Sequence, residues 1–122
     1  MALDHGVDSV REGGPLIPFL MSSEGEKISM QRFASDQLEE ATSLGRQHAA
    51  GLPRSVRLAA FVYDGYVTVG AKKSDAVMVE AYERGMPQAV VFAQRYQPAS
   101  GDTKLELIGN AAYVGTTKPL FR

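Results

Sequence analysis

The segment Ser74–Tyr96, SDAVMVEAYERGMPQAVVFAQRY, is the most apolar long stretch of this 122-residue chain. Its two halves are rich in valine and alanine, and the sequence RGMP between them contains the turn formers glycine and proline. A loop at residues 84–87 would place Val79 opposite Phe92 in an antiparallel pair. The segment therefore predicts a β-hairpin, and the rest of the fold follows from the sequences on either side of it.

The sequence upstream of this hairpin predicts a second one. VRLAAFVYDGYVTV, residues 56–69, contains Asp64 and Gly65 between two strand-like runs. An Asp-Gly pair in this setting is a strong signal for a two-residue type I′ turn. Such a turn would place Tyr63 opposite Tyr66.

Strands are also predicted near both ends of the chain. Residues 104–114, KLELIGNAAYV, predict a last strand with a bulge or bend at Gly109 and Asn110. Residues 16–21 and 28–33 are apolar segments on either side of a polar stretch, which predicts an N-terminal hairpin.

One helix is predicted, within SDQLEEATSLGRQHAAG at residues 35–51. Ser35 or Asp36 can cap its start, and acidic residues fill its first turn, as the helix dipole prefers. Its expected apolar stripe follows helical spacing: Leu38, Ala41, Leu44 or Gly45, and His48. Residues 1–14 contain few large apolar groups and predict a mobile or loosely docked tail.

Together these elements predict a single α+β domain over residues 15–122. It is mainly an antiparallel β-sheet, with an N-terminal hairpin, one helix and then about five strands. The single helix is expected to pack on one face of the sheet. The face with Val77, Val79 and Ala81 is the candidate core.

The composition excludes several classes of function. The chain has no cysteine, so it has no disulfide framework, thiol catalysis or cysteine zinc site, and a reducing cytoplasm is the expected location. A net charge of −1 gives no general attraction to nucleic acid, and the longest apolar runs are too short to span a membrane. The N-terminus lacks the basic start and apolar run of a secretory signal.

The other face of the predicted sheet is the candidate interface. One helix cannot cover both faces of a broad sheet, and large apolar patches on a monomer usually mark contacts. We therefore expect a homodimer that meets through this face. The interface residues are expected to be Met78, Tyr82, Val91 and Ala93.

Two alternative sites follow from polar residues in the same strands. Tyr63, Tyr66, Glu80 and Arg95 are candidates for a small-ligand pocket between helix and sheet, in a binding protein or an enzyme.

Asp75 and Glu80, with Lys72 or Lys73, are candidates for a Mg²⁺ site of a nuclease-like enzyme. The two acidic residues are five positions apart, so a bulge would be needed to bring them to one face.

No catalytic motif, cofactor motif or metal-ligand spacing occurs in the sequence, and neither His5 nor His48 has a ligand partner at a suitable spacing. The favoured hypothesis is therefore a non-catalytic soluble domain that self-associates or binds a protein partner.

Overall fold

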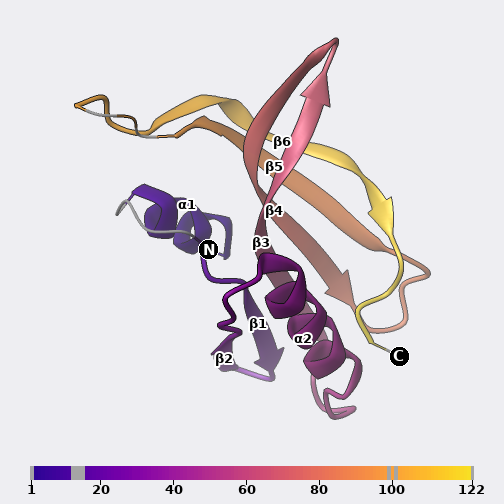
Figure 1. The fold of residues 1–122 in the computed structure, drawn as a ribbon. Coiled ribbons are helices and arrows are strands. Elements are labelled where there is room, and N and C mark those ends of the chain that lie inside the picture. The colour runs from indigo at the N-terminus through magenta and orange to yellow at the C-terminus, as the bar shows by residue number, and fades with distance from the viewer. Residues whose placement is uncertain (1, 12–15, 99, 101, 122) are drawn as a thin grey trace.

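Two helices and six strands make up the part of the chain described in this computed structural model, which is residues 2–11, 16–98, 100 and 102–121. In chain order the elements are α1 (Ala2–Arg11), β1 (Phe19–Glu24), β2 (Lys27–Arg32), α2 (Leu38–Ala50), β3 (Leu58–Val69), β4 (Lys72–Glu83), β5 (Ala89–Gln97) and β6 (Glu106–Thr117). Figure 1 shows the two helices next to a single curved sheet.

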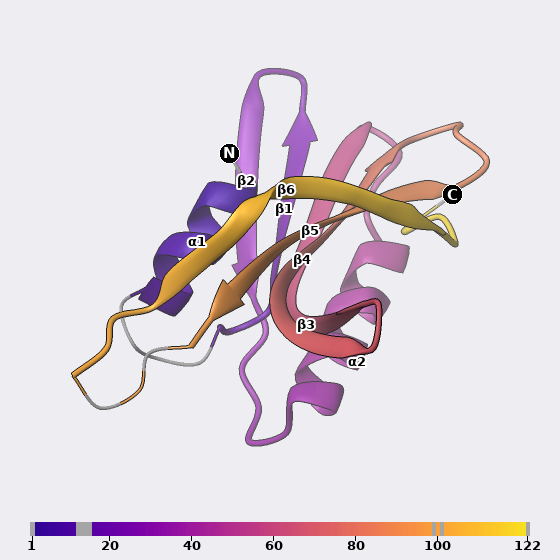
Figure 2. The same ribbon diagram turned by 90° about the horizontal axis from the view of Figure 1, so that it is seen from above.

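The six strands form one antiparallel sheet in the order β2-β1-β3-β4-β5-β6. The N-terminal β1–β2 hairpin forms one edge of this sheet and β6 forms the other edge (Figure 2). The predicted α+β, mainly antiparallel class is confirmed. The sheet has one strand fewer than the sequence predicts, because residues 58–69 form a single strand.

The turn predicted at Asp64 and Gly65 is wrong. β3 passes straight through both residues and pairs Tyr63 with Met78 instead of Tyr66. No described residue other than glycine has a positive φ, and Gly65 is not among the positive-φ glycines. A Cβ on Gly65 would lie 2.8 Å from Cγ of Met78, so this glycine provides room for a neighbouring side chain.

The chain reverses direction five residues later. Val69 pairs with Lys72, so Gly70 and Ala71 form the two-residue loop. Gly70 has φ 65° and Ala71 does not have a positive φ, the combination expected in a type II′ turn. The Asp-Gly pair was misleading because β4 is as long as β3 and pairs with it on both sides of Asp64 and Gly65.

The predictions for β5 and β6 are confirmed. Val79 pairs with Phe92, as the hairpin loop predicted. The β5–β6 register shifts between Ala93 and Arg95, and Gly109 has φ 65°, so the expected bulge is present. Gln94, which is 5 % exposed, stabilises the bulge: its Nε2 donates to the carbonyl oxygen of Gly109 at 3.2 Å.

Helix α2 covers one face of the sheet, here called the α2 face, and it packs through small residues. Ala41, Gly45 and Ala49 are its buried positions, and a Cβ on Gly45 would lie 2.4 Å from Cε1 of Phe61. The predicted stripe is therefore partly wrong, because Leu38 and Leu44 are exposed. The large residues of the buried cluster that includes Ala49 come from the strands, from the β2–α2 connection and from residues 120–121: Leu20, Phe33, Phe61, Tyr82, Leu120 and Phe121.

Helix α1 lies on the opposite face, here called the α1 face, and the sequence did not predict it. Gly6 fits closely over Val62 and Val77, since a Cβ there would lie 2.9 Å and 2.7 Å from their Cγ1 atoms. Val7 is buried in the same apolar cluster as Phe19. Residues 1 and 12–14 of the predicted tail lie outside the described residues, and the mobility of this segment stays a prediction.

The four predicted interface residues lie on the α2 face and are buried within one chain. Met78, Tyr82, Val91 and Ala93 are 9 %, 5 %, 8 % and 3 % exposed. Met78, Val91 and Ala93 pack against Tyr63 and Val67 of the long β3–β4 hairpin, which extends beyond its neighbours in Figure 1. The reason for expecting a partner over this face therefore no longer applies, and self-association stays a prediction.

Candidate functional site

An open apolar groove lies on the α1 face, next to the part that α1 covers. Its floor is a row of directly paired residues across four strands: Met21, Ala60, Ala81 and Val90. The side chains in the middle of this row are alanines, so the floor is low. The groove has a volume of about 490 Å³ and is bounded by Ala2 of α1 on one side.

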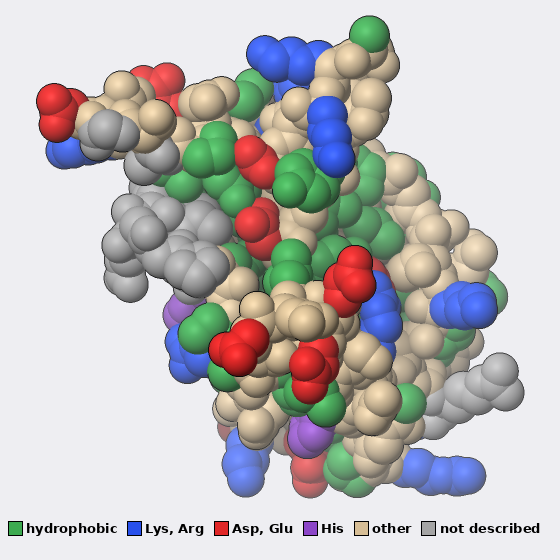
Figure 3. Space-filling model, in the orientation of Figure 1, with side chains coloured by type: hydrophobic (Ala, Val, Ile, Leu, Met, Phe, Trp, Pro, Cys, Tyr) green, Lys and Arg blue, Asp and Glu red, His purple; other side chains and the backbone are tan. Residues whose placement is uncertain are grey.

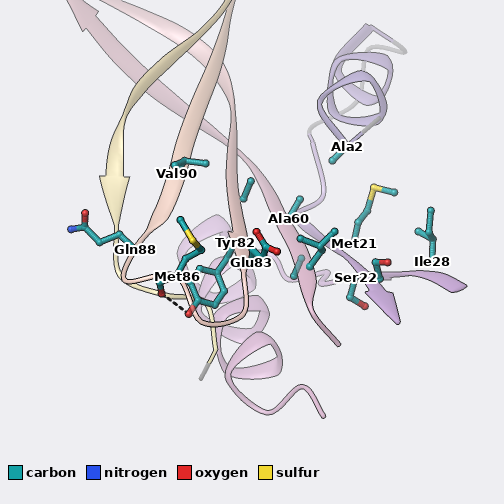
Figure 4. A pocket seen from close by; sticks show the side chains of 14 residues that line it. Ala2, Met21, Ser22, Ile28, Ala60, Tyr82, Glu83, Met86, Gln88 and Val90 are labelled. Atoms are coloured by element: carbon teal, nitrogen blue, oxygen red, sulfur yellow. Dashed lines mark hydrogen bonds between the residues drawn. The ribbon is translucent and has the colours of Figure 1, made fainter. Parts of the chain in front are cut away.

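Larger apolar side chains form the walls of the groove. Ile28, Leu58 and Met86 line it and are 55 %, 50 % and 51 % exposed. Figure 4 shows side chains from β1, β2, the β4–β5 hairpin and the start of α1 around this space. These residues come from segments far apart in the sequence, and together they form a concave surface.

Among the described residues that line the groove, Glu83 is the acidic one. It stands at the end of β4, opposite Leu58, and is exposed. Within the described part of the chain its carboxylate has no ion-pair partner. The groove therefore combines an apolar floor with one free negative charge.

An ion pair with a buried glutamate lies on the α2 face, where the sequence predicts a small-ligand pocket. Glu80 is 2 % exposed and accepts two hydrogen bonds from Arg46 of α2, with N–O distances of 2.7 Å and 2.6 Å. Tyr63 also donates to Glu80, at 2.6 Å. Burial and the neighbouring Glu80 raise the pKa of Tyr63, and the hydrogen bonds that Arg46 donates to Glu80 raise the pKa of Arg46.

The structure brings together only two of the four residues predicted to form a small-ligand pocket. Tyr63 and Glu80 bind each other and Arg46. Tyr66 lies elsewhere and is 61 % exposed. The centroid of its ring lies 4.1 Å from Nζ of Lys73, toward the tip of the β3–β4 hairpin, where Figure 3 shows basic side chains. Arg95 lies near the bulge, with one guanidinium nitrogen 3.6 Å from a Cβ built on Gly109.

The missed partner was Arg46, and the sequence contained one signal for it. A glutamate in the middle of an apolar strand needs a compensating charge when it is buried. Arg46 follows directly after Gly45, which packs closely on Phe61 of the sheet. Both oxygens of Glu80 accept hydrogen bonds, and the pair connects α2 to the sheet.

The candidate Mg²⁺ residues are not brought together. Asp75 pairs with Tyr66 and Tyr96 on the α1 face, whereas Glu80 lies on the α2 face. Within residues 2–11, 16–98, 100 and 102–121, no three potential ligands form a metal-binding group. His48 is exposed, with its ring centroid 5.5 Å from that of Phe33.

Asp64 forms a second polar contact, on the α1 face. Tyr96 donates a hydrogen bond to its Oδ1 at 2.7 Å. Burial raises the pKa of Asp64, and the nearby Asp75 adds to the effect. Burial and Asp64 also raise the pKa of Tyr96.

Asp64→Asn is expected to stabilise the protein increasingly as the pH rises from acid to neutral. The folded protein holds the Asp64 proton more tightly than the unfolded chain does. This contribution to stability is complete below the ordinary aspartate pKa of about 3.9 and is lost as the pH rises through the higher folded-state pKa. Asparagine carries no charge and keeps an acceptor for Tyr96. Urea unfolding of wild type and variant across this pH range measures the difference, with exposed Asp102→Asn as control; a constant difference would contradict the prediction.

Comparisons with models of protein families, with curated proteins and with solved structures found no match. Among the described helices, neither α1 nor α2 has the length and apolar character needed to cross a membrane.

Proposed function

We propose that the protein is a non-catalytic binding module, whose groove on the α1 face takes an amphipathic helix of a partner protein. The observation that carries the proposal is the open apolar groove beside α1. Single exposed apolar residues are common on any protein, but contiguous apolar patches usually mark binding sites. Here exposed Ile28, Leu58 and Met86 line one concave surface.

A helix is the occupant that the surface favours. α1 already packs on the same face, and it approaches closely because Gly6 has no side chain. The groove provides similar room, since alanines form the middle of its floor and larger residues stand at its edges. Methionines such as Met21 and Met86 adapt to different partner side chains.

Charge adds a further requirement for the partner. Glu83 at the rim has no ion-pair partner in the part of the chain that the structure describes, so a lysine or arginine at the edge of the partner's apolar stripe would pair with it. Such a pair would fix the orientation of the bound helix more than it would strengthen binding. The absence of cysteine supports a reducing compartment, the cytoplasm, as the place where this binding occurs.

Leu58→Glu is expected to weaken binding of a helical probe peptide at least about tenfold, because the charge replaces exposed apolar surface at the groove wall. The probe is an amphipathic peptide of leucine, alanine and lysine. Methyl resonances of Met21, Ala60 and Ala81 should shift when it is added to isotope-labelled protein. Fluorescence anisotropy of the labelled peptide gives the affinity.

Leu44→Glu is the matched control. Leu44 is 44 % exposed and Leu58 is 50 % exposed, but Leu44 lies on α2, away from the groove. The control should bind the probe as wild type does. Shifts confined to other surfaces, or equal losses in both variants, would refute the proposed function.

A further inference from the structure

The two edge strands of the sheet, β2 and β6, differ strongly in how easily another strand could pair with them. The β2 edge has six residues and carries a charge at each end, Lys27 and Arg32. The β6 edge has twelve residues, from Glu106 to Thr117, with no proline or lysine. Leu107, Tyr113 and Val114 on β6 are 38 %, 59 % and 48 % exposed.

Natural sheets usually protect such edges with charges, prolines or short strands, because an unpaired edge accepts another strand. β6 has β5 as its only neighbouring strand within the described residues. It therefore presents a long row of backbone donors and acceptors on its open side. A second β-strand is the partner that such an edge accepts best.

The sequence of β6 is complementary to itself in antiparallel orientation. With a two-fold axis at Ala112, Glu106 of each copy faces Lys118 of the other, so opposite charges meet at both ends. The small residue Ala112 faces its own copy at the centre.

The two positive-φ glycines of β6 also face each other in this arrangement. Gly109 and Gly115 are the two residues of β6 with positive φ, at 65° and 152°. The same axis places Gly109 of one copy opposite Gly115 of the other. The positions without side chains therefore face each other, so the two backbones can approach closely there.

We propose that two copies of the chain pair antiparallel through their β6 strands, about a two-fold axis at Ala112, and join their sheets into one continuous sheet. The interface is isologous, so it closes after two copies and forms a dimer instead of a filament. This contact is separate from the groove, and it replaces the buried surface around Met78 and Val91 as the site of self-association.

The first test is the mass in solution together with cross-linking. Light scattering should give about twice the 13.2 kDa chain mass as concentration rises. The chain has no cysteine, so Ala112→Cys introduces a single thiol next to the axis. Directly opposite residues have Cα atoms about 4.5–5.5 Å apart, within the range of a disulfide. Oxidation should therefore convert most of this variant to a covalent dimer.

Ala111→Cys is the matched control, because Ala111 faces Tyr113 of the other copy in this register. Its two thiols belong to residues whose Cα atoms lie roughly 8 Å apart, too far for a disulfide. More dimer from Ala112→Cys than from Ala111→Cys supports the proposal. A monomer at every concentration, no dimer from either variant, or more from Ala111→Cys would overturn it.

The second test uses the charges at the strand ends. Glu106→Lys and Lys118→Glu each place like charges opposite one another and should weaken dimerisation several-fold. The double variant restores the opposite charges and should recover wild-type affinity. Both side chains are exposed, so folding should be unaffected. Single variants as strong as wild type, or a double variant no stronger than the singles, would overturn the register.

Discussion

Arg46→Ala should lower the free energy of unfolding by about 3 kcal/mol, because removing one partner of a buried pair leaves the other charge unpaired. Glu80 is 2 % exposed and would lose two hydrogen bonds from Arg46. Breaking a buried ion pair usually costs about 3–5 kcal/mol. We expect the lower end of this range because the Arg46 side chain is 45 % exposed and water can approach it. Urea titration followed by circular dichroism measures the change.

Two further variants separate this effect from a general loss of charge. Arg32→Ala removes an exposed arginine from β2 and should change stability little. The triple variant Arg46→Met, Tyr63→Phe and Glu80→Leu replaces the ion pair, and the hydroxyl that donates to Glu80, with apolar groups of similar volume, and it should recover most of the loss. If Arg46→Ala costs no more than Arg32→Ala, the pair does not hold α2 on the sheet.

Gly45→Ala should destabilise the protein by roughly 1–3 kcal/mol through overpacking. In an exposed helix the same substitution would stabilise by about 1 kcal/mol. The sign reverses here because the new Cβ would lie 2.4 Å and 2.6 Å from Cε1 and Cζ of Phe61. Phe61 is fully buried and its ring packs against those of Phe33 and Tyr63, so moving it away from position 45 would disturb both contacts.

Thermal unfolding of Gly45→Ala and of the double variant Gly45→Ala and Phe61→Leu tests this explanation. The smaller leucine should relieve the contact. Gly45→Ala should therefore lower the melting temperature less in the Phe61→Leu background than in wild type. Ser43→Ala, at an exposed position of the same helix, provides the helix-propensity baseline. A rise in melting temperature for Gly45→Ala would show that the helix and sheet are not in close contact.

Local pairing was predictable from the sequence. The loop at residues 84–87 sets the pairing of Val79 with Phe92, and the bulge at Gly109 follows from a glycine inside a strand pattern. The turn at Asp64 and Gly65 was mispredicted because a glycine can either allow a turn or make room for a neighbouring side chain, and the sequence does not distinguish the two. At Gly65 it makes room for Met78, whereas the reversal occurs at Gly70.

The arrangement of the two faces was not predictable, because both carry apolar residues. α2 contacts the sheet through Ala41, Gly45 and Ala49, so its larger leucines gave a misleading stripe. α1 was missed because its close contact depends on Gly6, which adds nothing to hydrophobic periodicity. The groove is the area that α1 leaves uncovered, and its position therefore depends on helix packing that the sequence pattern does not show.

The ion pair between Arg46 and Glu80 also implies an order of events as the chain folds. The two residues are 34 positions apart, whereas the β3–β4 hairpin closes over a loop of only two residues. Local contacts generally form faster than distant ones. We therefore expect β3 and β4 to pair first, while Glu80 is still hydrated. The arrival of α2 then removes water from the carboxylate and supplies the arginine in one late step.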